Sequence, residues 1–177
     1  ICAESGDRCD IVTGDRDSFQ LIANPGTNVL LVSTRAGKTE TLRFDRDAVM
    51  QKYGLPPEKM IDLKALMGDA SDNIPGVRGV GEKTAVDLVQ RFGSINAIYR
   101  DLDTLDVRDA LRAKLAAGRD DAFLSRELAT ICLTTPITFS PEATLHAEVD
   151  RDALRQILEE LEFKHFIARL GLDQAED

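Results

Sequence analysis

Four aspartates stand in two short clusters whose spacing suits a hard metal ion. Asp15 and Asp17 follow the apolar run 9–13, and Asp69 and Asp72 lie in the sequence GDASDN. Side chains two apart on an extended segment share a face, and side chains three apart meet on a helical turn or a tight bend. Carboxylate oxygens are the ligands that Mg²⁺ and Mn²⁺ prefer, and two such ions can activate water against a phosphodiester. The spacing therefore predicts a catalytic metal site built from the four aspartates.

Each aspartate pair also has a purely structural interpretation. Asp15 and Asp17 could cap a helix that begins at Ser18, and the pair by itself does not decide between capping and metal binding. Asp72 could start a turn before a proline, and Asp69 could be a solvated cap. The metal interpretation is favoured because both pairs occur together with the glycine-rich segment that follows Asp72.

That segment reads PGVRGVG from 75 to 81 and is typical of a loop that contacts a phosphate backbone. Glycine admits a second backbone where a side chain would block it. The helix expected from about Glu82 offers its unpaired amides and positive dipole end to an anion, and two cations flank the loop. The residues expected to contact a nucleic-acid backbone are Gly76, Val77, Arg78, Gly79, Val80, Gly81, Lys83 and Thr84.

Two other interpretations of the loop are disfavoured. A nucleotide-binding P-loop needs lysine directly after its second glycine and a strand leading in, but Glu82 follows Gly81 and the approach is helical. A plain connector with glycine caps is disfavoured because Val77 and Val80 would anchor the loop in the core while the cations point outward. The loop is therefore expected to be a hairpin that holds a phosphate backbone.

The surrounding pattern predicts strands first and helices afterwards. Strands are expected at 9–13, 28–34 and 39–44, with a turn at Ala36-Gly37. Helices are expected at 45–53, 60–67, 82–92 and 94–102. Residues 107–131 are expected to form two helices divided near Gly118, and Leu124 and Leu128 of the second should face the core. A last helix is expected to carry an apolar stripe from Leu154 to Leu170. A short strand is expected at 137–139.

Composition bounds the class of protein. The chain has 177 residues, 43% of them hydrophobic, and a formal net charge of −9, which argues against broad polyanion binding but not against a local contact. Its three cysteines favour free thiols in a reducing cytoplasm. No apolar run is long enough to cross a membrane, and no signal peptide is visible. The chain does not begin with Met, and three short strands leave one sheet face open, so we expect a further segment upstream.

Four motifs resemble the 5′–3′ exonuclease domain of bacterial DNA polymerases I and the related stand-alone 5′–3′ exonucleases and flap endonucleases. They are TGDRD (13–17), KYGL (52–55), GDASDNIPGVRGVGEKTA (68–85) and LEF (161–163). The resemblance implies an α/β remnant, part of a PIN-like sheet, followed by a mostly α-helical subdomain with a helix-hairpin-helix. The implied divisions are 1–55 for the nuclease core, 56–172 for the helical subdomain with the helix-hairpin-helix at about 68–92, and 173–177 for a polar tail or linker.

The resemblance also implies a function. Members of the family cut 5′ flaps and degrade duplex DNA from 5′ ends in replication and repair. It implies that Asp15, Asp17, Asp69 and Asp72 act through two Mg²⁺ or Mn²⁺ ions, that the hairpin binds duplex DNA, and that its carbonyls bind K⁺. The intact protein is expected to be a cytoplasmic, nucleoid-associated monomer with no membrane partner. The resemblance leaves open whether a polymerase domain follows this region, because the family includes both DNA polymerases I and stand-alone exonucleases.

The family places further metal carboxylates and basic residues in a first half that this sequence does not contain. We therefore expect the 177-residue chain to be inactive, or nearly so, by itself. Two other functions remain open: a non-catalytic module that binds duplex DNA through the hairpin, and a structural fragment without DNA affinity, which the net charge supports. The aspartates that follow the first strand favour the nuclease, because clustered carboxylates repel DNA unless metal neutralises them.

Overall fold

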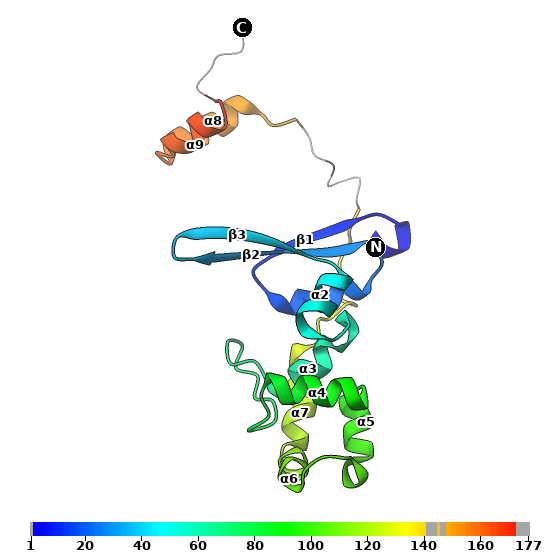
Figure 1. Cartoon of the computed structure of the whole chain (residues 1–177). Coiled ribbons are helices and arrows are strands. Elements are labelled where there is room, and N and C mark those ends of the chain that lie inside the picture. The colour runs from blue at the N-terminus through cyan, green and yellow to red at the C-terminus, as the bar shows by residue number, and fades with distance from the viewer. Residues whose placement is uncertain (1, 141–144, 146–147, 173–177) are drawn as a thin grey trace. The chain divides into compact units, whose positions relative to one another are not determined.

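The computed structural model describes residues 2–140, 145 and 148–172. By packing, the chain divides into two compact units, 1–133 and 134–177, which are drawn in Figure 1. The expected division near residue 55 therefore falls inside the first unit by packing, and it stays a prediction as a functional boundary. The polar tail expected at 173–177 lies outside the described residues.

The first unit begins with a three-stranded sheet in the order β1-β2-β3. Strand β1 (Cys9–Thr13) runs parallel to β2 (Thr27–Arg35), and β2 pairs antiparallel with β3 (Lys38–Phe44). Ala36 and Gly37 form the two-residue connection between β2 and β3, with φ of 49° and 75°. Positive φ at both central residues matches the right-handed twist of the strands that they join. The three expected strands and the expected turn are confirmed.

Helices make up the rest of the first unit. They are α1 (Cys2–Ser5), the 3-10 helix η1 (Arg16–Ala23), α2 (Arg46–Tyr53), η2 (Pro57–Lys59), α3 (Met60–Met67), α4 (Glu82–Phe92), α5 (Ile95–Arg100), η3 (Leu102–Thr104), α6 (Asp109–Ala117) and α7 (Arg119–Ala129). Figure 1 shows that α2 to α7 lie on one side of the sheet. A small sheet followed by a mostly helical region is the predicted fold class.

One hydrophobic core joins the sheet to these helices. Phe19 of η1 packs against Phe44 of β3 with ring centroids 4.6 Å apart, and Leu63, Leu66 and Leu88 are almost fully buried between α3 and α4. Several helix ends follow their sequence signals. Asp45 caps α2, Ser94 caps α5, and left-handed Gly54 ends α2.

Helix α7 buries the opposite face from the one that its leucines predict. Leu124 and Leu128 are 47% and 57% exposed, whereas Ala122, Ser125 and Ala129 are buried. The cause is that α7 packs closely along α3, and a close helix approach requires small side chains. The expectation that Leu124 and Leu128 serve the core is therefore wrong.

The second unit contains two short helices in place of the one expected. Helix α8 (Arg151–Glu160) is capped by Asp150, and α9 (Lys164–Arg169) follows after Glu162, whose φ of 57° interrupts the helical backbone. Residues 137–139 form no strand, so that expectation is also wrong. Within the described residues of both units, no helix has the length and apolar character needed to cross a membrane.

Candidate active site and nucleic-acid interface

A cleft of about 740 Å³ lies where β1, η1 and α3 meet. Three of the four predicted aspartates line it: Asp15, Asp69 and Asp72. Asp17 is on η1 beside the cleft and contacts Lys64, which does line it. The structure therefore brings both aspartate pairs to one place although more than fifty residues separate them.

Asp15 and Asp17 do not continue the extended geometry of β1. The strand ends at Thr13, whose Oγ1 accepts a hydrogen bond from the Asp15 amide at 3.0 Å. Asp15 then caps η1 by accepting from the Asp17 amide at 2.8 Å. Asp15 thus both caps η1 and lines the cleft. Asp17, in the first turn of η1, is directed toward Lys64 of α3.

Lys64 of α3 links the two predicted pairs. Its Nζ forms ion pairs with Asp17 Oδ1 and Asp69 Oδ2, and the side chains of Lys64, Asp17 and Asp69 are only 13%, 15% and 19% exposed. Sequence reasoning overlooked this lysine. The available signal was the single cation of the segment Met60–Met67, which has apolar residues on both sides, because a buried ammonium needs a carboxylate partner.

The contacts of this cluster shift its proton affinities in different directions. Hydrogen bonds from Lys64 and then from Ser71 lower the pKa of Asp69 to about 2. Burial raises the pKa of Asp17 more than Lys64 lowers it. Burial disfavours the charged form of Lys64, but the two aspartates together outweigh it and raise its pKa. At neutral pH the cluster therefore holds an ammonium between a firmly ionised carboxylate and a less acidic one.

The cleft only partly resembles the predicted metal site. Within residues 2–140, 145 and 148–172, no group of three or more His, Cys, Asp and Glu side chains is arranged to hold a metal ion. The donor chemistry nevertheless suits a hard cation, because Asp15, Asp69 and Asp72 are oxygen ligands in one cleft. A cation already lies between Asp17 and Asp69, and it is the Lys64 ammonium.

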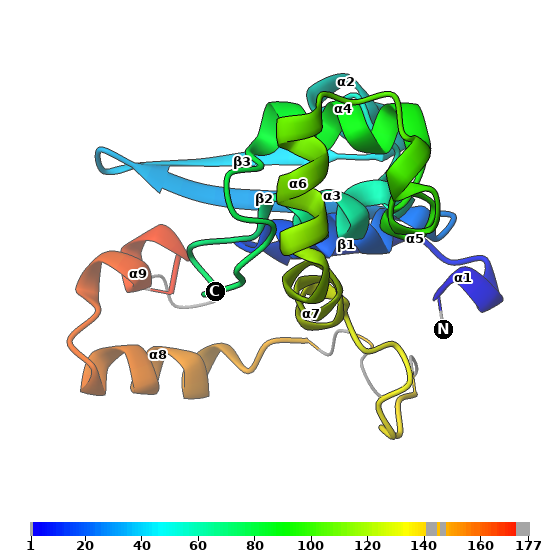
Figure 2. The same cartoon turned by 90° about the horizontal axis from the view of Figure 1, so that it is seen from below.

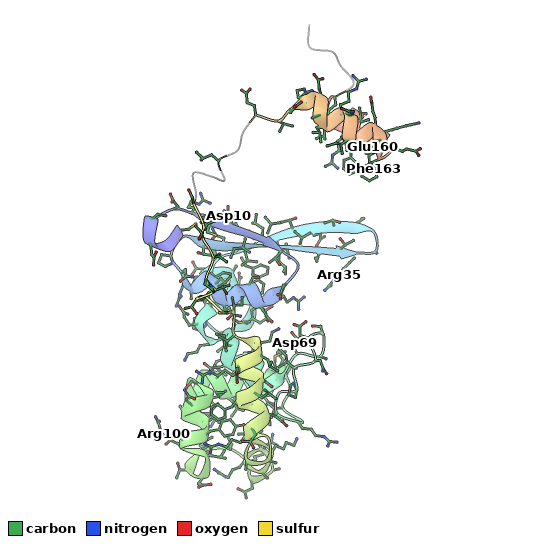
Figure 3. All side chains as sticks on the ribbon, turned by 180° about the vertical axis from the view of Figure 1, so that it is seen from behind. Asp10, Arg35, Asp69, Arg100, Glu160 and Phe163 are labelled. Carbon is green, nitrogen blue, oxygen red and sulfur yellow. The ribbon has the colours of Figure 1, made fainter. Side chains whose placement is uncertain are left out.

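The second aspartate pair is presented by the segment 68–81, which connects α3 to α4. The backbones of Asp69 and Ile74 exchange two hydrogen bonds of 2.9 Å, which closes a tight turn over the residues between them. Asn73 in that turn has a φ of 58°. The turn places Asp69 and Asp72 on the cleft side, and Figure 3 labels Asp69 there.

The same connection is anchored to the helices on both sides. Val77 and Val80 are 2% and 4% exposed, which confirms that they anchor the loop in the core. The Val77 amide donates to the Leu66 carbonyl of α3, and the Gly76 amide donates to Ser125 Oγ of α7, both at 2.8 Å. Ser125 is fully buried, and no sequence pattern in α7 had marked it.

Ser125→Ala is expected to lower the free energy of unfolding by about 1–3 kcal/mol, because the Gly76 amide would lose its buried partner. Urea denaturation measures the loss. Ser33→Ala on β2 is the control, since the structure gives that hydroxyl no hydrogen bond among the described residues. Equal losses in the two variants would contradict a special role for Ser125.

The predicted DNA-binding residues do not face the acidic cleft. Arg78 and Gly79 line a groove with α6, and Lys83 and Thr84 line a separate groove on α4. At Gly81 an added Cβ would meet no atom within 4 Å. Gly81 is therefore not required for packing, and the space beside it is open to a second molecule.

A comparison with known families and proteins places these features. The family model described as 5′-3′ exonuclease, C-terminal SAM fold, matches residues 55–152. DNA polymerase I of Caldicellulosiruptor bescii is 43% identical over 164 residues, which are 93% of this chain and 19% of the relative. DNA polymerase I of Bacillus subtilis is 39% identical over 173 residues, 98% of this chain and 19% of the relative. This chain thus spans about a fifth of the length of these curated relatives.

A solved structure shares the fold. The structure of T5 5′-exonuclease with bound divalent metal ions (zinc) superposes with a TM-score of 0.59 at 25% identity. The match covers 70% of this chain and 43% of the T5 chain. The similarity therefore extends over most of this chain but less than half of the T5 chain.

Proposed function

We propose a function from one premise: this chain belongs to the 5′-3′ exonuclease family, in the region with the C-terminal SAM fold. The chain forms part of a metal-dependent 5′–3′ exonuclease and 5′-flap endonuclease that acts on duplex DNA. The observation that carries the proposal is the continuity of segment 68–81. At one end it places Asp69 and Asp72 in the acidic cleft, and at the other it leaves open space beside Gly81 at the start of α4.

In this proposal Asp15, Asp17, Asp69 and Asp72 supply ligands to Mg²⁺ or Mn²⁺. A bound divalent ion would activate water and stabilise the leaving oxygen of a phosphodiester. Lys64 holds Asp17 and Asp69 in place while no metal is bound and gives up that position to the ion. The metal ions in the T5 exonuclease structure support a metal-dependent reaction.

Segment 68–81 and its flanking helices α3 and α4 act as a helix-hairpin-helix in this proposal. The loop and the first amides of α4 contact the phosphate backbone of duplex DNA, with K⁺ at the hairpin carbonyls. Backbone contact carries no base information, so substrates are selected by shape, including a 5′ flap or a 5′ end. The names of the relatives support a polymerase domain elsewhere in the parent protein. We also propose that the parent protein is a cytoplasmic monomer.

One observation favours the alternative of a non-catalytic module that binds duplex DNA. Lys64 already neutralises Asp17 and Asp69, and a carboxylate paired in this way needs no metal. The two functions differ in whether a divalent ion stabilises the cleft. Substitution of Lys64 therefore separates them.

The test of the proposed function is Gly81→Leu. Because Gly81 has a φ of −93° and no neighbour for an added Cβ, the variant should fold, with a loss below about 1 kcal/mol because leucine is a poorer N-cap than glycine. Its side chain would fill the space proposed for a DNA backbone. We expect the dissociation constant for a fluorescent 5′-flap duplex, measured by anisotropy in K⁺ and Ca²⁺, to rise at least tenfold.

Gly81→Ser is the matched control. Serine is small, and at this N-cap position its hydroxyl can accept from the first turn of α4, which stabilises a helix by about 0.3 kcal/mol relative to glycine. It should therefore raise the melting temperature and leave most DNA affinity. Unchanged affinity in a folded Gly81→Leu variant would exclude the hairpin as the DNA contact.

A further inference from the structure

A further groove, separate from the two described above, lies between segment 68–81, the first turn of α4 and α6. It measures about 260 Å³, and the six residues that line it define the α6 groove: Gly79, Thr84, Arg108, Ala110, Leu111 and Lys114. Two of them are cations, one is a hydroxyl residue and none is acidic, in a chain whose net charge is −9. Figure 2 shows α6 beside this segment.

Lys114 connects α6 to the hairpin directly. Its Nζ donates a hydrogen bond to the Gly79 carbonyl at 3.2 Å. An ammonium has three N–H donors, and this contact uses one. Gly79 has a φ of 80°, and an added Cβ would lie 3.1 Å from Nζ. The lysine is therefore held against the hairpin tip by backbone geometry, with its charge at the edge of the groove.

Arg108 is positioned by a different arginine. Arg112 donates to the carbonyls of Leu102, Leu105 and Val107 at 2.5, 2.8 and 3.3 Å, so its guanidinium is used to fix the chain that leads into α6. Arg108 follows at the N-cap of α6, where its carbonyl accepts from the amides of the first turn. Its side chain lines the α6 groove and the neighbouring groove that contains Lys83.

Two of the nearby acids share one arginine. Asp87 and Asp106 line the neighbouring groove, and both form ion pairs with Arg91 at 3.3 and 2.9 Å. Arg91 therefore offsets one of these two negative charges, and Asp121 adds a third carboxylate in a further groove that Lys114 shares. Arg108 and Lys114 remain as the cations that face the α6 groove.

We propose that Arg108 and Lys114 form a second phosphate contact, so that a DNA backbone held by the hairpin continues across α6. This rests on the proposed function and extends it from one loop to two segments. The ligand is a nucleic-acid phosphate, because the groove offers two cations and a hydroxyl and none of its lining side chains is acidic. The contact is independent of base sequence.

The experiment is an anisotropy titration of two labelled duplexes of unrelated sequence, each with a 5′ flap, at several salt concentrations. The proteins are the wild-type chain, Gly81→Leu, the double variant Arg108→Ala/Lys114→Ala, and Lys114→Arg. Arg100→Ala is the matched control, because Arg100 is a solvent-exposed arginine that points away from segment 68–81 in Figure 3. Thermal melting verifies that each variant is folded.

Each phosphate contact contributes about 0.9 to the slope of log K against log salt. The double variant should therefore have a slope shallower by about 1.8 on both duplexes. Lys114→Arg, which keeps the charge, and Arg100→Ala should both keep the wild-type slope. If Gly81→Leu weakens binding but the double variant keeps the wild-type slope, the α6 contact is excluded and the hairpin proposal stands. If the wild-type chain does not bind either duplex, both proposals fail. Inorganic phosphate that competes with DNA in wild type and not in the double variant would further support the site.

Discussion

Gly76→Ala is expected to destabilise the protein by about 4 kcal/mol or more, which is among the largest effects of a single substitution. An added Cβ at Gly76 would lie 2.2 Å from the Gly68 amide nitrogen and 2.6 Å from the Met67 carbonyl carbon. Both neighbours are backbone at the end of α3, so no side-chain rotation can relieve the clash. The φ of 61° adds strain for any residue with a Cβ. Relief requires segment 68–81 to move away from α3.

Two glycine controls separate the causes of this loss. Gly37 has a φ of 75° and open space around its Cβ position, so Gly37→Ala measures the cost of backbone strain, about 1–2 kcal/mol. Gly81 has an ordinary φ and open space, so Gly81→Ala should cost less than about 1 kcal/mol, through the weaker N-cap alone. Urea denaturation of the three variants gives the comparison. Equal losses for Gly76→Ala and Gly37→Ala would show that the close approach to α3 is unimportant.

Local signals predicted the elements because their causes are local. The two-residue turn at Ala36-Gly37, the cap of α2 at Asp45 and the start of α4 at Glu82 each depend on a few neighbouring residues. The α7 face was mispredicted because that choice depends on α3. The apolar periodicity of α7 by itself favours burial of Leu124. The close packing of α7 on α3 instead buries the small side chain of Ala122 and leaves Leu124 exposed.

The candidate site was predicted in the same uneven way. Both aspartate pairs could be found from spacing and from the resemblance, and the structure places them around one cleft. The contacts that hold them could not be found, because they connect distant segments: Lys64 reaches from α3 to η1, and Ser125 reaches from α7 to the hairpin. A lysine in an apolar helix and a serine on a small-residue face indicate that partners exist, but only the packing identifies them.

Lys64→Met is expected to lower the free energy of unfolding by about 2–3 kcal/mol, less than the 3–5 kcal/mol for a fully buried pair because the cluster keeps some solvent contact. It leaves Asp17 and Asp69 facing each other without a counter-ion. The pKa of Asp69, now about 2, should rise toward its ordinary range, as NMR titration would show. In the wild-type chain the depressed pKa of Asp69 stabilises the fold above about pH 4, and this contribution is lost as the pH falls toward 2. The variant lacks the contribution, so its free energy of unfolding should fall less than that of wild type across this pH range.

The same variant decides whether the cleft binds metal. With Lys64 gone, a divalent cation can take the place of the ammonium between Asp17 and Asp69, so Mg²⁺ or Ca²⁺ should raise the melting temperature of Lys64→Met more than that of wild type. Lys59→Met is the control. Its ion pair with Asp62 is longer, at 3.9 Å, and Lys59 is more exposed than Lys64, so the substitution should cost less than about 1 kcal/mol and show no such metal response. Adding Asp69→Asn to Lys64→Met should abolish the response. A metal response absent from Lys64→Met would mean that these carboxylates serve only the lysine, and the non-catalytic alternative would then be favoured.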